Sequence, residues 1–315
     1  MTTLITGGAG FVGSHLAKKL LAAGDDVLLL DNFDDYYDPA LKRARVAALA
    51  PDAPLIEADI RDYDAVTKVF AEHTIDRVVN LAAMPGVRYS VGRAREYLAV
   101  NTTGAVNLMD AAAQGDVEVF VQASTSSVYG QAERVPFQEE DAADRPLAPY
   151  PASKRASELF AHSFHNLHSL NVTVLRFFNV YGPYGRPDMM PVKALDSILA
   201  GDTIRMWNNG QLKRDWTYID DTVNGVASAL QRPLGFQLIN LGYGAPLPFS
   251  DFISIYEELV GVEAVKIVED APPTEPLITY CDNTRARELL DFDPQVSIQD
   301  GLHAVWTWYR EAKGI

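Results

Sequence analysis

The chain has 315 residues, of which 48% are hydrophobic and 22% are charged, so it can bury a substantial core and has room for two lobes. Its 27 basic and 42 acidic residues give a net charge of −15, which disfavours nonspecific binding to nucleic acid or to an anionic membrane. A single cysteine, Cys281, excludes an intrachain disulfide and a cysteine-cluster metal site, and is typical of a protein from the reducing cytoplasm. The first predicted strand begins almost at Met1 and no apolar run of about eighteen residues follows, so we expect neither a signal peptide nor a membrane span.

The opening segment predicts a dinucleotide-binding turn. A buried strand at Thr2–Thr6 leads into a glycine-rich turn, with Gly7, Gly10 and Gly13, and into the start of a helix. Because glycine has no Cβ, the backbone can turn tightly there and approach a pyrophosphate, which the amides of the helix start would face. Asp31 follows about 20 residues later, where its carboxylate can bind the adenosine ribose hydroxyls and repel a 2′-phosphate. The sequence therefore predicts NAD rather than NADP.

Apolar runs alternate with segments of helical period through the first part of the chain, which predicts a doubly wound parallel sheet of the Rossmann type and an α/β fold. The predicted strands are Thr2–Thr6, Val27–Asp31, Leu55–Ala58, Arg77–Leu81, Val117–Ala123 and Val172–Phe177. From Val180 the strands become shorter and more scattered, which indicates a smaller second lobe, although Leu238–Leu241 again resembles a buried strand. We therefore expect a dinucleotide-binding domain of residues 1–179 and 215–241 and a C-terminal α/β lobe of residues 180–214 and 242–315. The last predicted helix, Ile298–Lys313, has an apolar stripe typical of core packing.

Tyr150 and Lys154 are four residues apart, so on a helix both side chains lie on one face. A lysine ammonium and a positive nicotinamide ring would both favour the phenolate, which makes Tyr150 a candidate base near neutral pH. The same spacing occurs at Tyr309 and Lys313, so the spacing alone does not identify a catalytic pair. What distinguishes Tyr150 is the hydroxyl-rich stretch Ala123–Gly130 at a predicted strand end, where doubly wound folds bind their ligands.

Three histidines, His162, His165 and His168, recur on the predicted helix after Lys154. A spacing of three residues drifts around a helix, and no carboxylate completes a ligand set, so we expect no metal site.

The chain resembles the extended short-chain dehydrogenase/reductase family, that is, the NAD-dependent epimerases and dehydratases, nearly from end to end. The matching segments are Thr6–Gly13, Asp59–Asp62, Asn80–Ala83, Asn101–Gly104, Thr125, Tyr150 with Lys154, Arg176–Pro183 and Arg214–Asp221. The resemblance implies a nucleotide-sugar 4-epimerase, an isomerase, with NAD as its cofactor and the C-terminal lobe holding a UDP-sugar. It also implies a homodimer, in which the helix after Lys154 forms the interface.

The resemblance also implies which residues form the site. Catalysis would rest on Thr125, Tyr150 and Lys154. The cofactor contacts would be Gly7, Gly10, Phe11, Val12, Gly13, Asp31, Asn32, Asp59, Ile60, Leu81, Ala82, Ala83, Asn101, Tyr150, Lys154 and Val180. The substrate contacts would be Arg88, Ser124, Thr125, Ser126, Asn179, Arg186 and Arg214, with Arg214 and Arg88 on the diphosphate.

Three segments resemble the UDP-glucuronate 4-epimerases in particular: Asp31–Arg45, Pro85–Ser90 and Gly185–Met189. This resemblance implies that Arg186 holds the sugar carboxylate, for which a guanidinium fork is well shaped. The 4,6-dehydratases have acidic residues after the catalytic threonine, and the decarboxylases have a glutamate where Ser127 stands, so the chain departs from both patterns.

The alternatives are a UDP-glucose or UDP-N-acetylglucosamine 4-epimerase, a UDP-glucuronate decarboxylase, and a noncatalytic NAD-sensing scaffold. The chain also departs from many related epimerases at Ala271–Tyr280, which has no arginine for the diphosphate.

Overall fold

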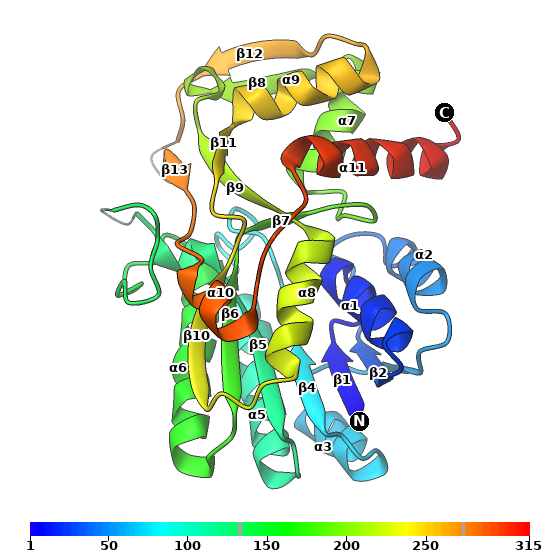
Figure 1. The fold of residues 1–315 in the computed structure, drawn as a ribbon, viewed down its shortest axis with the longest axis vertical. Coiled ribbons are helices and arrows are strands. Elements are labelled where there is room, and N and C mark those ends of the chain that lie inside the picture. The colour runs from blue at the N-terminus through cyan, green and yellow to red at the C-terminus, as the bar shows by residue number, and fades with distance from the viewer. Residues whose placement is uncertain (132–133, 273–274) are drawn as a thin grey trace.

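A computed structural model describes residues 1–131, 134–272 and 275–315 (Figure 1). Its largest element is a seven-stranded parallel sheet with the order β10-β6-β5-β4-β1-β2-β3. The strands are Thr2–Thr6 (β1), Asp26–Asp31 (β2), Leu55–Glu57 (β3), Arg77–Asn80 (β4), Val119–Thr125 (β5), Val172–Phe177 (β6) and Phe236–Leu241 (β10). This is the doubly wound α/β fold predicted from the alternating pattern, and the late strand β10 does join the sheet. β5 continues past the predicted end at Ala123, so Thr125 is its last residue.

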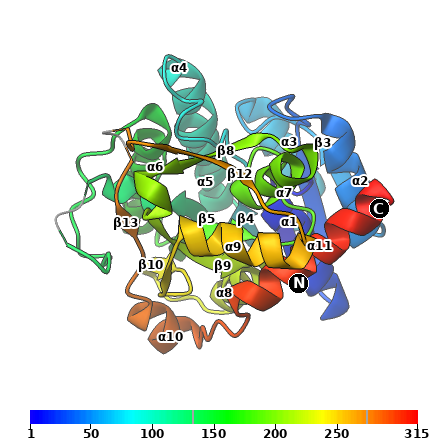
Figure 2. The same cartoon turned by 90° about the horizontal axis from the view of Figure 1, so that it is seen from above.

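Two layers of helices cover the sheet, because the strands are apolar on both faces (Figures 1 and 2). On one face Ile5, Val79 and Val121 pack in the same core cluster as residues of α1 and α8. On the other face Leu4 and Val78 pack with residues of α3 and α5, and each such fully buried side chain contributes about 1.5–3 kcal/mol. The helices of this domain are Phe11–Ala22 (α1), Pro39–Leu49 (α2), Tyr63–Glu72 (α3), Ala94–Tyr97 (α4), Ala105–Gln114 (α5), Pro149–His168 (α6) and Ile219–Leu230 (α8), with a π-helical segment at Leu98–Gly104.

A smaller lobe lies beyond the carboxyl ends of the main strands (Figure 1). It contains two small sheets: β7, β9, β11 and β13 form one, and β8 pairs with β12 in the other. The elements are Asn179–Tyr181 (β7), Met190–Ala200 (α7), Thr203–Trp207 (β8), Lys213–Tyr218 (β9), Pro246–Pro248 (β11), Phe249–Val260 (α9), Val265–Glu269 (β12), Ile278–Thr279 (β13) and Ile298–Lys313 (α11). The helix Thr284–Leu290 (α10) follows β13 in the chain but packs against β10 and α8 of the larger domain. Short 3-10 segments occupy Ser126–Tyr129 and Asn208–Gly210. Because β7 follows β6 closely and pairs with β9, the two lobes join at the edge where the main strands end.

The last helix, α11, has the predicted bounds and packs its apolar stripe into the core, with Leu302, Val305 and Tyr309 buried. The Tyr309 hydroxyl donates a 2.6 Å hydrogen bond to Asp196 of α7, and Lys313 lies 3.9 Å from the same carboxylate. The second tyrosine–lysine pair is therefore structural. Within the described residues, no helix is both long enough and apolar enough to cross a membrane.

Candidate active site

The glycine turn after β1 forms a cradle that side chains would fill. Gly7 has a φ of +65°, and a Cβ on it would lie 2.7 Å from the amide nitrogen of Ala82. A Cβ on Gly13 would lie only 2.3 Å from the carbonyl oxygen of Gly7, so the helix start packs directly against the turn. The amides at the start of α1 have no side-chain cap. The cradle therefore fits the pyrophosphate of a dinucleotide.

Asp31 ends β2 beside this cradle and is 5% exposed. Its carboxylate accepts hydrogen bonds from the amides of Ala9 (3.1 Å) and Phe33 (2.9 Å), and Lys42 lies 3.3 Å from it in a buried ion pair. Sequence reasoning missed Lys42, because nothing in the sequence indicates that the second helix turns this side chain toward the strand end. The backbone bonds and the ion pair hold Asp31 as a fixed acceptor for ribose hydroxyls.

Asp59 lies next to this region and is held by two neighbours. Asn32 donates a 2.9 Å hydrogen bond to it, and Arg61 binds it through both the backbone amide and the guanidinium. Burial raises the pKa of Asp59, but the hydrogen bonds from Arg61 and Asn32 outweigh that effect and lower the pKa to about 2. Asp59 is therefore a permanent acceptor at the adenosine end of the pocket.

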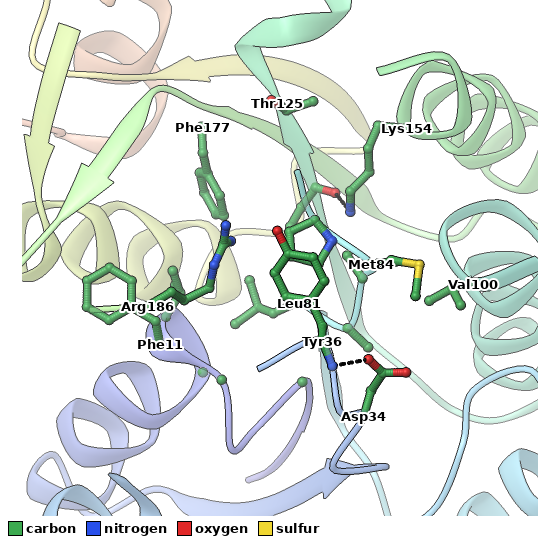
Figure 3. Close-up of a pocket in the computed structure, with 18 of the residues that line it drawn as sticks. Phe11, Asp34, Tyr36, Leu81, Met84, Val100, Thr125, Lys154, Phe177 and Arg186 are labelled. Atoms are coloured by element: carbon green, nitrogen blue, oxygen red, sulfur yellow. Dashed lines mark hydrogen bonds between the residues drawn. The ribbon is translucent and has the colours of Figure 1, made fainter. Parts of the chain in front are cut away.

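A pocket of about 390 Å³ runs from the glycine cradle to the carboxyl ends of β5 and β6 (Figure 3). Its walls include every predicted cofactor residue except Asn101, together with Ser124, Thr125, Ser126, Asn179 and Arg186 from the predicted substrate set. They also include residues that were not named individually as site residues from the sequence, among them Tyr36, Tyr37, Lys42, Met84, Pro85, Val100, Phe177 and Met189. Asn101 lies behind this wall, where its side-chain amide bonds both backbone groups of Met84 and the Ser153 hydroxyl.

The three predicted catalytic residues meet at the inner end of the pocket. Thr125 is the last residue of β5, and its hydroxyl donates a 3.2 Å hydrogen bond to Ser127. Tyr150 stands in the first turn of α6 and lines the pocket with Thr125, whose hydroxyl is near enough to lower the pKa of Tyr150. Lys154 lies one turn further along α6, and its ammonium donates a 2.9 Å hydrogen bond to the carbonyl oxygen of Ala123 (Figure 3). Ser124, which precedes Thr125, donates a 2.5 Å bond to Glu158 and is thereby held in the wall of the pocket.

The surroundings of Tyr150 include a cation, Arg186, that the sequence-based argument about its pKa did not consider. Burial raises the pKa of Tyr150 above its ordinary value, while the nearby hydroxyl of Thr125 and the positive charge of Arg186 lower it. Lys154 was expected to supply that lowering. Its own pKa falls to about 8 because burial penalises the charged form, although Glu158 raises it. Its ammonium is engaged with a backbone carbonyl, so in this structure Arg186 is the cation that favours the phenolate.

Arg186 projects into the pocket near Tyr36 (Figure 3). Its Nε and Nη2 atoms each donate a 2.9 Å hydrogen bond to one carboxylate oxygen of Asp188. The hydroxyl of Tyr36 donates to the same carboxylate at 3.0 Å, and the ring of Tyr36 packs edge-on against Tyr89. The three segments singled out from the sequence, Asp31–Arg45, Pro85–Ser90 and Gly185–Met189, are therefore brought together around the Tyr36 ring.

Arg88 and Arg214 lie outside the pocket walls but close to each other. Both pair with Glu275: Arg88 Nη2 lies 2.7 Å from one carboxylate oxygen, and Arg214 Nη2 lies 3.1 Å from the other. Arg88 also lies over the ring of Trp207, with its guanidinium carbon 4.5 Å from the ring centre. Glu275 belongs to the segment that has no arginine; residues 273–274 of that segment lie outside the described part of the chain.

The three histidines of α6 each have a separate structural contact. His162 packs edge-on against Phe236, Nδ1 of His165 lies 2.9 Å from the carbonyl oxygen of Leu170, and His168 stacks on Phe164. Over residues 1–131, 134–272 and 275–315, no three His, Cys, Asp or Glu side chains are grouped so that they could hold a metal ion.

The chain is similar to a known protein family and to several of its members. The family model described as the NAD dependent epimerase/dehydratase family matches residues 3–242. UDP-glucuronate 4-epimerase 4 of Arabidopsis thaliana is 39% identical over 328 residues, covering 98% of this chain and 75% of the plant protein. UDP-glucuronate 4-epimerase of Thermodesulfobacterium geofontis is 37% identical over 311 residues, covering 98% of this chain and 96% of the relative.

Among solved structures, the UDP-glucuronic acid 4-epimerase of Bacillus cereus in complex with UDP-glucuronic acid and NAD superposes with a TM-score of 0.91 at 33% identity, covering 99% of this chain and 100% of that one. The predictions of the fold, of NAD as the cofactor and of a UDP-sugar 4-epimerase are confirmed by these matches. The family model spans well over half of the sequence, and the chain belongs to the NAD-dependent epimerase/dehydratase family.

Proposed function

We propose that this enzyme interconverts UDP-glucuronate and UDP-galacturonate by inverting C4 of the sugar. The observation that carries the proposal is that Thr125, Tyr150 and Arg186 line one pocket with the glycine cradle, so a proton-transfer pair and a carboxylate-binding cation lie together. The similarity to relatives named UDP-glucuronate 4-epimerase supports the choice of a uronic acid. In this proposal the cofactor lies on residues 1–179 and 215–241, and the nucleotide sugar on residues 180–214 and 242–315.

The acid–base steps fall to Tyr150 and Thr125. Tyr150, as the phenolate, takes the proton of the sugar 4-hydroxyl, with the Thr125 hydroxyl bridging the two oxygens. The glycine cradle and Asp31 would hold NAD, which when bound would supply reversible hydride transfer at C4. The 4-keto sugar turns over in the pocket about its bonds to the diphosphate, and Tyr150 then returns its proton to the newly formed 4-oxygen. Arg186 favours the phenolate at the start of this cycle, because its positive charge lowers the pKa of Tyr150.

Arg186 has a second task when the substrate is a uronic acid. The 4-keto form is then a β-keto acid, which loses carbon dioxide readily when the C5–C6 bond aligns with the carbonyl π system. A guanidinium that holds both carboxylate oxygens near the carbonyl plane prevents that alignment. Asn179 and Ser126 line the pocket and would contact the sugar. Arg88 and Arg214, which share the partner Glu275, would serve the diphosphate.

A homodimer and a cytoplasmic location belong to the same proposal. Leu159 and Phe160 of α6 are 58% and 45% exposed, although the other face of this helix packs against β5 and α5. An apolar pair on a long surface helix is typical of an interface between copies. Cys281 is a buried free thiol, which fits a reducing compartment.

The proposal is tested by a proton NMR time course with UDP-glucuronate, in parallel with UDP-glucose and UDP-N-acetylglucosamine. We expect inversion at C4 of the uronic acid without release of carbon dioxide. Tyr150→Phe should lower kcat by about 10²–10⁴-fold while NAD binding persists, because the phenyl ring fills the same space without a proton-transferring oxygen.

Each contrary outcome identifies one alternative. Inversion of the neutral sugars alone indicates a UDP-glucose-type epimerase, and a UDP-pentose product indicates a decarboxylase. NAD binding without turnover of any of the three sugars indicates a sensor.

A further inference from the structure

The contacts around Arg186 point to a carboxylate outside the pocket wall, that of Asp188, which aims the guanidinium. We propose that Asp188, supported by Tyr36, is a positioning residue that fixes the orientation of Arg186 and thereby suppresses loss of carbon dioxide from the uronic acid. This inference rests on the proposed function, since it needs a substrate with a carboxylate.

The donor geometry of Arg186 carries the argument. A guanidinium has five N–H donors, and the hydrogen bonds to Asp188 use Nε–H and one N–H of Nη2. Nη1 and the second N–H of Nη2 have no partner among the described residues, and together they form the other flat edge of the guanidinium. A fork of two parallel hydrogen bonds fixes the plane of the group, so Asp188 determines where this second edge points.

Asp188 is placed to act from behind the site. Arg186 lines the pocket, whereas Asp188 is not part of the pocket wall and reaches the guanidinium from the loop before α7. A substrate carboxylate on the free edge of Arg186 would therefore be separated from Asp188 by the guanidinium itself. The two carboxylates would share one cation, as in other arrangements where a planar guanidinium bridges two acids.

Tyr36 holds the Asp188 carboxylate in turn. Its hydroxyl donates to the Oδ2 atom that also accepts from Nη2 of Arg186. Burial and the charge of Asp188 raise the pKa of Tyr36 to about 12, so it remains a hydroxyl donor at neutral pH. The backbone amide of Tyr36 is fixed by a 2.9 Å bond to Asp34 (Figure 3).

Close packing limits the movement of Tyr36 on the side that faces Gly86. A Cβ on Gly86 would lie 2.7 Å from the Tyr36 hydroxyl, and Gly86 has a φ of +93°, so this position requires glycine. Asp34 holds the backbone of Tyr36, the Tyr36 hydroxyl holds Asp188, and Asp188 holds Arg186, so residues from two distant segments are linked in series.

Loss of carbon dioxide, the side reaction that the Asp188–Arg186 pair opposes, has a defined course. The C5–C6 bond of the 4-keto carboxylate breaks, its electron pair forms the C4 enolate, and carbon dioxide leaves; a proton from solvent then adds at C5 and restores the ketone. Return of the hydride to C4 then gives a UDP-pentose in place of the epimer. Because this bond breaks only when it is aligned with the carbonyl π system, a guanidinium that rotates freely permits the loss and a fixed one does not.

The test measures the ratio of UDP-pentose to UDP-galacturonate by proton NMR, together with KM for UDP-glucuronate. In Asp188→Asn we expect this ratio to rise about tenfold, because the fork is broken. KM should stay within about fivefold of the wild-type value, because the guanidinium charge remains. Tyr36→Phe should shift the ratio in the same direction by less. As a control, Asp293→Asn removes the carboxylate partner of another exposed arginine, Arg287, and should leave the product ratio unchanged.

The outcomes separate this inference from the function on which it rests. A wild-type enzyme that does not invert C4 of UDP-glucuronate overturns both. If the wild type inverts C4 but the product ratio in Asp188→Asn is unchanged, only the positioning role of Asp188 is overturned. If Asp188→Asn does not fold, an unchanged ratio in Tyr36→Phe has the same meaning. A large rise in KM with no UDP-pentose also overturns it, because Asp188 would then act on binding rather than on orientation.

Discussion

Burial of the Lys154 ammonium lowers the free energy of unfolding by a measurable amount. Its side chain is 2% exposed, and burial lowers its pKa from 10.5 to about 8. Since one pKa unit corresponds to ~1.4 kcal/mol, keeping the ammonium charged in the folded state destabilises the protein by about 3 kcal/mol at neutral pH. The folded state binds this proton less tightly than the unfolded chain, so this destabilisation is full below about pH 8. It disappears as pH rises toward 10.5, and the free energy of unfolding increases across that window.

The comparison of wild type with Lys154→Met isolates this effect, because methionine fills a similar space without a charge. Between about pH 7 and about pH 9.5 the free energy of unfolding of the wild type should rise by about 2 kcal/mol relative to the variant, measured by urea denaturation without added NAD. Lys68→Met, which removes an exposed ammonium on α3, corrects for the change in net charge. Parallel curves for wild type and Lys154→Met would refute the reasoning. They would mean that the hydrogen bond to Ala123 fully offsets the loss of hydration.

Two further predictions concern the diphosphate and the dimer. Glu275→Gln should tighten binding of UDP, measured by calorimetry, by up to about fivefold. The reason is that Arg88 and Arg214 then lose an internal carboxylate that competes with phosphate. Unchanged or weaker binding would contradict a diphosphate role for the two arginines. Phe160→Glu should convert a dimer into a monomer in light scattering, because it places a charge on the exposed apolar face of α6; a monomeric wild type would rule out the proposed interface.

The sheet and its helices were predictable because local pattern and global packing agree in this part of the chain. The strands β1 and β6 have the predicted bounds, and β10 was recognised despite its distance in sequence from the other strands. Continuous apolar runs of this kind are the signature of strands buried on both faces. The end of β5 was misplaced because Ser124 and Thr125 are polar, and a polar strand end resembles a loop until the ligand-binding edge of the sheet is considered.

The contacts of the charged side chains were not predictable in the same way. Glu275 and Arg88 are 187 positions apart, and Tyr36 and Asp188 are 152 apart, so no periodicity relates them. Lys42 pairs with Asp31 because of how α2 packs beside β2, which the sequence does not state. The hydrogen bond of Lys154 to the Ala123 carbonyl was not predictable for a related reason. Spacing places the side chains of Tyr150 and Lys154 on one helix face but does not reveal that the ammonium is engaged with a carbonyl.

Three of the cations in or near the pocket share one feature that bears on specificity. Lys42, Arg186 and Arg214 each have a carboxylate partner, in Asp31, Asp188 and Glu275 respectively. In a chain with a net charge of −15, such pairs leave little free positive potential to attract anions from a distance. An anionic ligand must instead satisfy the unused N–H donors at short range, which only a molecule of the right shape can do. The paired cations therefore favour discrimination among anions over nonspecific attraction, and the shape of the UDP-sugar, rather than its charge alone, decides whether it binds.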